Sequence, residues 1–138
     1  MDTQTEKNKE VVKRYNREVI EQENVTSAKE LLDGKFVNHS APEGQNRTDA
    51  LIYFFNQMLR PGVPDLKVVI ELQVAESDMV TMHKRIYGTQ TGTLIGVPAT
   101  GKAVNIEIID MMKVQNGKIT EHWGVNTLPA VMAELAKP

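Results

Sequence analysis

The sequence predicts an α+β protein in which a layer of helices covers one face of a curved antiparallel sheet. Up to Leu59, apolar residues recur at the spacing of a helix face, and from Leu66 onward they alternate with polar residues as in strands. Asn116 and Gly117 lie between two alternating segments, and this pair is favoured in the tight turn of a β-hairpin. Helices that precede consecutive strands indicate an α+β arrangement and not alternating α/β units.

Three helices are expected before the main strands. The first is amphipathic, because its apolar residues fall on one helical face. The second follows a capping hydroxyl at Thr26 or Ser27, and Gly34 follows it as a stop. The third has an apolar face broad enough to cover a sheet. The expected ranges are Glu6 to Gln22, Thr26 to Leu32 and Thr48 to Leu59.

Strands are expected over most of the remaining chain. The turn at Asn116 and Gly117 sets the register of the last hairpin, because a two-residue type I′ turn pairs the flanking residues in order. In this register Asp110 lies opposite Trp123, and both share one face of the sheet. The expected strands are Lys35 to Asn38, Leu66 to Val74, Met79 to Tyr87, Ala103 to Val114 and Ile119 to Val125, followed by a helix from Leu128 to Ala136.

The composition is that of one soluble domain spanning residues 1–138. Lys and Arg number 16 and Asp and Glu number 18, and the resulting net charge of -2 argues against a nucleic-acid partner. The lack of cysteine excludes thiolate catalysis and cysteine-bound metals. Neither a secretory signal nor a stretch of about 20 apolar residues occurs, so we expect a cytoplasmic location without membrane insertion.

One carboxylate interrupts an apolar strand face. From Ala103 to Val114 the even-numbered residues are apolar except Asp110, so this side chain is expected to point into the interior. Burial without a partner raises the pKa of a carboxyl group. We therefore expect Asp110 to be partly protonated near neutrality and suited to general acid–base chemistry, and its replacement by asparagine to stabilise the protein at neutral pH. The alternative is a structural aspartate held by hydrogen bonds.

Other residues are candidates to line a pocket. Trp123, the only tryptophan, faces Asp110 in the expected register, and His39 precedes a proline-containing loop. His83 lies in a strand whose two faces are equally mixed, which leaves open the side to which it points. The three histidines lack the spacing of zinc ligands, and no metal site is expected. The motifs of serine hydrolases, P-loop nucleotide triphosphatases and dinucleotide-binding folds are absent.

A series of motifs follows in order along the chain: Pro64-Asp65-Leu66, Gly88 to Gly92, Gly96 to Lys102, Asp110, Asn116 to Ile119 and Glu121-His122-Trp123. With these motifs, the segment from Phe36 to Leu135 resembles the SnoaL-like polyketide cyclases, or ester cyclases, of the nuclear transport factor 2-like superfamily. Ketosteroid isomerase and scytalone dehydratase belong to the same superfamily. The resemblance implies a cone-shaped sheet wrapped around the N-terminal helices, an internal apolar cavity and a homodimer.

The resemblance also implies roles for particular residues. An aspartate at the position of Asp110 is the general acid–base in cyclases of this family, where it removes a proton from a carbon flanked by carbonyls without a metal or other cofactor. His39 and Trp123 match positions expected to line the cavity. Gln90 stands where the family often has histidine and Asn126 where it often has aspartate, so Gln90 offers a hydrogen-bonding amide in place of a titratable group.

Three functions are compatible with these observations, and we rank them in order. The first is a cofactor-independent cyclase or isomerase that acts on a bulky apolar carbonyl compound, with Asp110 as the acid–base group. Its candidate substrate-binding residues are His39, Trp123, Gln90, His83 and Tyr15. The second is a non-catalytic protein that binds a small apolar molecule in the same cavity. The third is a dimeric interaction module, although polar residues expected on the outer face, such as Glu107 and His122, argue against a large interface.

Overall fold

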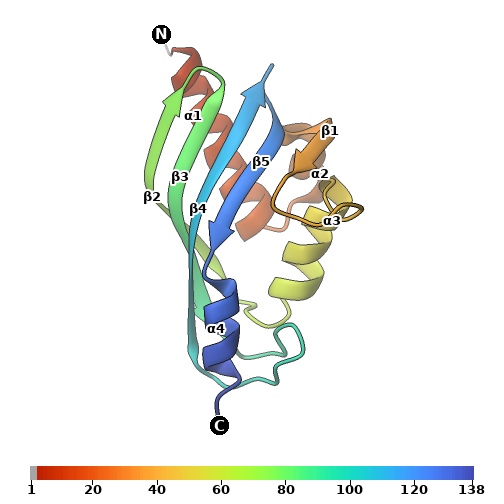
Figure 1. Ribbon diagram of the computed structural model, residues 1–138, viewed down its shortest axis with the longest axis vertical. Helices are drawn as coiled ribbons and strands as arrows, with labels where there is room; N and C mark the ends of the chain where they lie inside the picture. Colours follow the sequence, from red (N-terminus) through yellow and green to blue (C-terminus); the bar gives the residue numbers. More distant parts are fainter. Residues whose placement is uncertain (1–2) are drawn as a thin grey trace.

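Five strands form one sheet in the computed structural model of the chain, which describes residues 3–138 (Figure 1). The strands are β1 (Leu32–Asn38), β2 (Lys67–Glu76), β3 (Met79–Thr89), β4 (Ala103–Gln115) and β5 (Lys118–Asn126). The α-helices are α1 (Gln4–Arg14), α2 (Val25–Leu31), α3 (Thr48–Tyr53) and α4 (Leu128–Leu135). Two π-helical segments, η1 (Tyr15–Glu21) and η2 (Phe54–Leu59), continue α1 and α3 directly. Every expected helix and strand is therefore present.

Strands β2 to β5 form the expected antiparallel meander, and β1 adds a parallel partner at one edge. The order across the sheet is β1-β5-β4-β3-β2. The parallel pairing sets Asn38 beside His122, so the loop after β1 begins next to the middle of β5. The expected stop at Gly34 is wrong, because β1 begins at Leu32, directly after α2, and includes this glycine.

The first helix combines a regular start with a wider second half. Thr3 caps α1, its hydroxyl accepting from the backbone N–H of Glu6 while the Glu6 carboxylate accepts from the N–H of Thr3. In η1 the π-helical turns bury Tyr15 and Asn16 side by side. Short π-helical segments inside α-helices occur frequently at functional sites. Here the buried residues are the polar Asn16 together with Tyr15, Val19 and Ile20.

Alternate residues of the central strands face the helices and form the core. In β4 the even positions Val104, Ile106, Asp110, Met112 and Val114 are buried, as expected. In β3 the buried residues are Val80, Met82, Lys84 and Ile86. This burial pattern shows which face of β3 is the inner one, a point that the sequence left open. Its even-numbered residues point inward, and His83 points outward.

The hairpin between β4 and β5 begins as expected. Asn116 and Gly117 have φ values of 53° and 75°, and both are positive, as a type I′ turn requires. Val114 pairs with Ile119 beyond the turn. The prediction of this turn from the Asn-Gly pair is confirmed.

Beyond the turn, the register differs from the expected one by one residue. Thr120 is an extra residue on β5, so that Asp110 pairs with Gly124 and Met111 pairs with Trp123. The expectation that Asp110 and Trp123 share a face is wrong, because a one-residue β-bulge turns all following side chains to the other side of the sheet.

Candidate functional site

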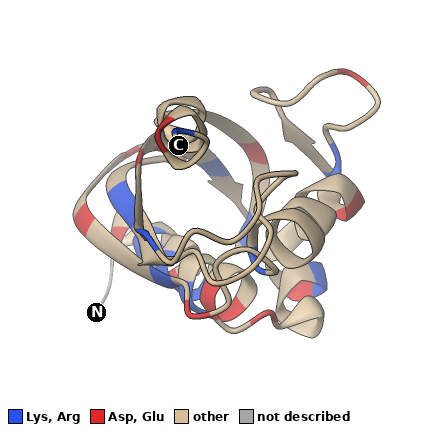
Figure 2. Ribbon diagram, turned by 90° about the horizontal axis from the view of Figure 1, so that it is seen from below, with Lys and Arg blue, Asp and Glu red and all other residues tan. Residues whose placement is uncertain are grey.

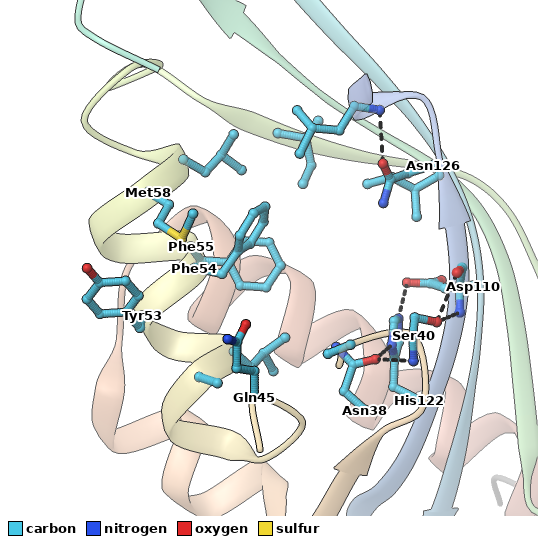
Figure 3. Close-up of a pocket in the computed structure, with 18 of the residues that line it drawn as sticks. Asn38, Ser40, Gln45, Tyr53, Phe54, Phe55, Met58, Asp110, His122 and Asn126 are labelled. Carbon is cyan, nitrogen blue, oxygen red and sulfur yellow. Dashed lines mark hydrogen bonds and ion pairs between the residues drawn. The ribbon is translucent and has the colours of Figure 1, made fainter. Parts of the chain in front are cut away.

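A pocket of about 950 Å³ lies between the inner face of the sheet and the helix formed by α3 and η2 (Figure 3). The helix side is apolar and presents Phe54, Phe55 and Met58. Isoleucines of β3 and β4, at positions 86, 106 and 108, contribute further apolar lining. A pocket of this size and composition suits a compact organic molecule with an apolar skeleton.

Polar side chains gather on the opposite side of the pocket, where β1, β4 and β5 meet. Figure 3 shows Asn38, Ser40, Asp110 and His122 close together there. The bulge in β5 brings His122 to this side, next to Asp110. Ser40 holds the loop after β1 against β5, because its hydroxyl donates to the carbonyl of Gly124 at 2.9 Å and accepts from the N–H of the same residue at 2.6 Å.

Asp110 forms a buried ion pair with Lys84. The ammonium nitrogen of Lys84 lies 3.0 Å from Oδ2 of Asp110, and the two side chains are only 3% and 2% exposed. Lys84 also donates to Oδ1 of Asn16 at 2.7 Å, and Asn16 in turn donates to the carbonyl of Val12 at 2.9 Å. The buried amide of η1 therefore orients the lysine that neutralises the carboxylate.

The expectation of a raised pKa for Asp110 is wrong. Burial by itself raises the pKa of this carboxyl group, but the charge of Lys84 and the imidazole of His122 together outweigh burial, and the pKa lies below its ordinary value of 3.8. Asp110 is therefore ionised at neutral pH. Burial, together with the negative charge of Asp110, raises the pKa of Tyr15, whose ring also lines the pocket.

The two oxygens of Asp110 have different surroundings. Oδ2 contacts Lys84 and also lies 3.4 Å from Nε2 of His122. Oδ1 is buried, and no described residue donates a hydrogen bond to it. A buried carboxylate oxygen with an unused lone pair is uncommon, because a missing hydrogen bond there costs about 1–3 kcal/mol. Asp110 lines the apolar pocket, but Oδ1 itself is closed off from solvent, so a ligand would reach it only after a local movement of the surrounding side chains.

Two residues that were expected to line the pocket lie elsewhere. Trp123 is on the outer side of β5, where its ring stacks on that of His39 at a centroid distance of 4.7 Å and an interplanar angle of 13°. His39 also places Nε2 2.9 Å from a carboxylate oxygen of Glu121. Neither side chain lines the pocket. The two rings pack against each other outside it.

His83 and Gln90 also lie outside the pocket. His83 is on the outer face of β3, with Nε2 2.7 Å from the carboxylate of Glu107. Gln90 is fully buried, and its side chain bonds to the loop that joins β3 to β4: it donates to the carbonyls of Val97 and Pro98 and accepts from Thr100. Of the sequence candidates, Asp110 and Tyr15 line the pocket.

Sequence reasoning missed Lys84, His122 and Asn38 as site residues. A signal for Lys84 was present, since it interrupts the apolar even positions of β3 as Asp110 interrupts those of β4. Two opposite charges on the inner faces of neighbouring strands indicate an ion pair. His122 could not be placed without the bulge, and Asn38 required the parallel pairing of β1 with β5.

Charged residues of both signs are mixed over residues 3–138, as Figure 2 shows. Within this described part of the chain, no three His, Asp or Glu side chains are arranged to hold a metal ion. None of its helices has the length and hydrophobicity needed to cross a lipid bilayer.

The comparisons with known proteins identify relatives of this fold. Three solved structures are similar over nearly the full chain. A proposed SnoaL-like polyketide cyclase from Jannaschia sp. CCS1 has 26% sequence identity and a TM-score of 0.84, with 100% of this chain and 98% of that chain covered. AclR, a proposed hydroxylase from Streptomyces galilaeus, has 19% identity and a TM-score of 0.82, with 97% and 98% covered. IdmH, a proposed polyketide cyclase from Streptomyces antibioticus, has 20% identity and a TM-score of 0.78, with 94% and 99% covered.

These neighbours share the curved sheet and helices of the nuclear transport factor 2-like fold. No curated protein matches the sequence. The sequence pattern that defines SnoaL-like polyketide cyclases matches residues 10–135, which is most of the chain. The chain therefore belongs to the SnoaL-like polyketide cyclase family.

Proposed function

We propose that the protein is a cofactor-independent enzyme of the cyclase or isomerase type that acts on a bulky apolar carbonyl compound bound in the pocket. The observation that carries this proposal is the carboxylate of Asp110, which lies at the edge of an apolar pocket with Oδ2 held by Lys84 and Oδ1 free of protein partners among the described residues. The apolar walls would hold the carbon skeleton, and a small rotation of the Asp110 side chain would bring Oδ1, which is buried, to the reacting carbon.

The chemistry begins with Asp110 as a base, because its lowered pKa keeps the carboxylate ionised at neutral pH. A base of this kind suits an acidic C–H bond, such as one between two carbonyl groups. The proton passes from carbon to Oδ1, and the electrons of the C–H bond form the C=C bond of an enolate. The charge of Lys84 favours the negative charge that develops on oxygen. In a cyclisation the nucleophilic carbon then attacks a second carbonyl carbon of the same molecule, whose C=O π bond opens to an alkoxide that takes the proton back from Asp110. In an isomerisation Asp110 instead returns the proton to a different carbon of the enolate.

The enolisation of benzoylacetone tests this proposal without knowledge of the natural substrate. We expect the protein to accelerate the return of benzoylacetone to its keto–enol equilibrium after dilution from an apolar solvent, followed by absorbance. Asp110→Asn should lower the catalysed rate by roughly 10²–10⁴-fold with little change in affinity. Asp78→Asn is the matched control, because Asp78 lies in the turn between β2 and β3, away from the pocket. A full rate in Asp110→Asn would refute the proposal.

A second candidate function is the binding of an apolar molecule without catalysis. The ion pair between Asp110 and Lys84 favours it, because a carboxylate that is neutralised by a buried lysine also fits a structural role. This function predicts that benzoylacetone binds to the wild type without acceleration. It also predicts that Asp110→Asn leaves the affinity unchanged.

We also propose that the outer sheet face forms the homodimer that the resemblance implies. Leu72, Ile109 and Val125 lie in one row across β2, β4 and β5, with His83 of β3 between them. The three apolar side chains are 60%, 48% and 70% exposed. A row of exposed apolar side chains is typical of the centre of a protein interface, where it would be removed from water.

A further inference from the structure

Asn38 fixes the position of the proton on His122. The backbone N–H of Ser40 donates to Oδ1 of Asn38 at 3.0 Å, which identifies this atom as the carbonyl oxygen of the amide. Nδ1 of His122 lies 2.8 Å from the same oxygen. A carbonyl oxygen accepts hydrogen bonds and donates none, so Nδ1 carries a hydrogen. In the neutral ring Nε2 is therefore the nitrogen without a hydrogen.

Nε2 of His122 lies at the pocket beside the carboxylate. It is 3.4 Å from Oδ2 of Asp110, and the side chain is 15% exposed and lines the pocket. A Cβ atom on Gly124 would lie 3.2 Å from Nε2, so the glycine leaves space next to this nitrogen. The titratable groups around the carboxylate are Lys84 from β3, His122 from β5 and Tyr15 from η1.

We propose that His122 is a second proton-transfer residue of this site and that Asn38 is the residue that positions it. The proposal rests on the proposed function, because an acid at the carbonyl oxygen assists the enolisation that Asp110 begins as a base at the carbon. A base and an acid that act together avoid a free enolate, which would be costly in an apolar pocket.

The proton transfers balance as follows. Protonated His122 gives its Nε2 proton to the carbonyl oxygen of the substrate while Asp110 takes the proton from the neighbouring carbon. The C–H bond breaks, its electrons form a C=C bond, and the C=O group becomes C–OH. The products are an enol, a neutral carboxylic acid and a neutral imidazole that keeps its Nδ1–H. In the return step Asp110 protonates carbon, and Nε2 removes the enol proton.

Long-range ¹H–¹⁵N spectra of the three histidines test the tautomer directly. In His39 and His83 the hydrogen-bonded nitrogen is Nε2, which lies 2.9 Å and 2.7 Å from a carboxylate, so these neutral rings should carry hydrogen on Nε2. In His122 Nε2 also faces a carboxylate, but at 3.4 Å, and the shorter contact is the one of 2.8 Å from Nδ1 to the carbonyl oxygen of Asn38. At a pH where the rings are neutral, we expect His122 alone to show the Nδ1–H pattern. A wild-type spectrum with hydrogen on Nε2 of His122 would overturn the proposal.

Two substitutions of Asn38 separate positioning from folding. Asn38→Asp keeps an oxygen that accepts from Nδ1 and from Ser40, so it should retain the Nδ1–H tautomer of His122. Asn38→Leu removes the acceptor and should release the ring to a mixture of tautomers with a lower kcat. The wild-type and Asn38→Asp spectra decide the tautomer even if Asn38→Leu fails to fold. If Asn38→Leu folds and keeps both the Nδ1–H tautomer and full kcat, Asn38 does not position His122.

The benzoylacetone assay tests whether His122 takes part in catalysis. His122→Phe should lower the catalysed rate by roughly 10²-fold or more, because it removes the general acid. A rate within a factor of about two of wild type would overturn the proton-transfer role of His122. A full rate in Asp110→Asn would refute the proposed function instead, and the spectra would still report the tautomer, so the two failures are distinguishable.

Discussion

Replacement of Lys84 by methionine is expected to destabilise the protein strongly, because it leaves Asp110 buried without its counter-charge. The two charged groups are 3.0 Å apart and almost fully buried. Removal of one partner from a buried ion pair costs about 3–5 kcal/mol, out of a total folding free energy of about 5–15 kcal/mol for a typical domain. For a chain of this length, this cost corresponds to a decrease in Tm of roughly 10–20 °C, measurable by circular dichroism.

The pH dependence distinguishes a lost ion pair from lost packing. In the wild type the pKa of Asp110 lies below 3.8, so its stabilising contribution is present above that value and is lost as the pH falls through the folded-state pKa. In Lys84→Met the lysine charge no longer offsets the effect of burial, so the pKa of Asp110 should rise above 3.8. The variant would then lose stability as the pH rises from 3.8 through the raised pKa. The difference between the two proteins should therefore grow from acid to neutral pH.

Lys113→Met is the matched control for this experiment. Lys113 lies on the outer face of β4, where it pairs with Glu121 at 3.7 Å and is about one-third exposed. Its loss should cost less than about 1 kcal/mol, as for other surface ion pairs. The double variant Lys84→Met with Asp110→Asn should recover part of the stability, because no buried charge is left alone. A cost below about 1 kcal/mol for Lys84→Met at neutral pH, or parallel pH curves, would refute the reasoning.

Three further predictions concern the pocket and the sheet faces. Gly124→Ala should cost about 1–3 kcal/mol in thermal unfolding and should lower the benzoylacetone rate, because its Cβ would lie 3.1 Å both from Cβ of Asp110 and from Cε1 of His122. Trp123→Phe should leave the affinity for benzoylacetone unchanged in a binding titration, because the indole lies outside the pocket. Ile109→Glu should raise the dissociation constant of the proposed homodimer in sedimentation over a concentration series, because it places a charge in the apolar row.

Each of these predictions has a result that contradicts it. A Gly124→Ala variant with wild-type Tm and rate would mean that the space beside Asp110 is not needed. Weaker binding in Trp123→Phe would contradict the outward position of the indole, and Phe55→Ala, which alters the pocket wall, serves as the positive control. A wild-type protein that sediments as a monomer at every concentration would exclude the homodimer.

The positions of the helices and strands could be predicted because burial repeats with the period of each element. In β4 the expected alternation and the observed burial coincide from Val104 to Val114 except at Ile108, which is half-buried and lines the pocket. The bulge at Thr120 left no such signal. Ile119 is apolar and is followed by Thr120, Glu121 and His122, all polar, so the pattern fits either register. The bulged register is the one in which this part of β5 also pairs with β1, a contact between residues far apart in the sequence.

The electrostatics of the site were mispredicted because one strand was considered alone. Burial of Asp110 followed correctly from β4, but the sign of its pKa shift depends on Lys84 of β3. In β3 the outward positions carry His83 and Arg85, and Lys84 is the one charge among apolar inward positions, so the lysine made the inner face look as mixed as the outer one. A charge on the inner face of one strand is best interpreted together with the inner faces of its neighbours.

The extra residue at Thr120 also affects how sequences of this family are compared. The residues on either side of it keep their partners, Ile119 with Val114 and Glu121 with Lys113, so a relative that lacked Thr120 would still turn an imidazole at position 122 toward the ligand. A relative of equal length without the bulge would instead turn the indole of its tryptophan inward. Matched positions in an alignment can thus lie on opposite sides of the sheet. Which side chain reaches the pocket depends on whether the bulge is present, and not on the alignment position alone.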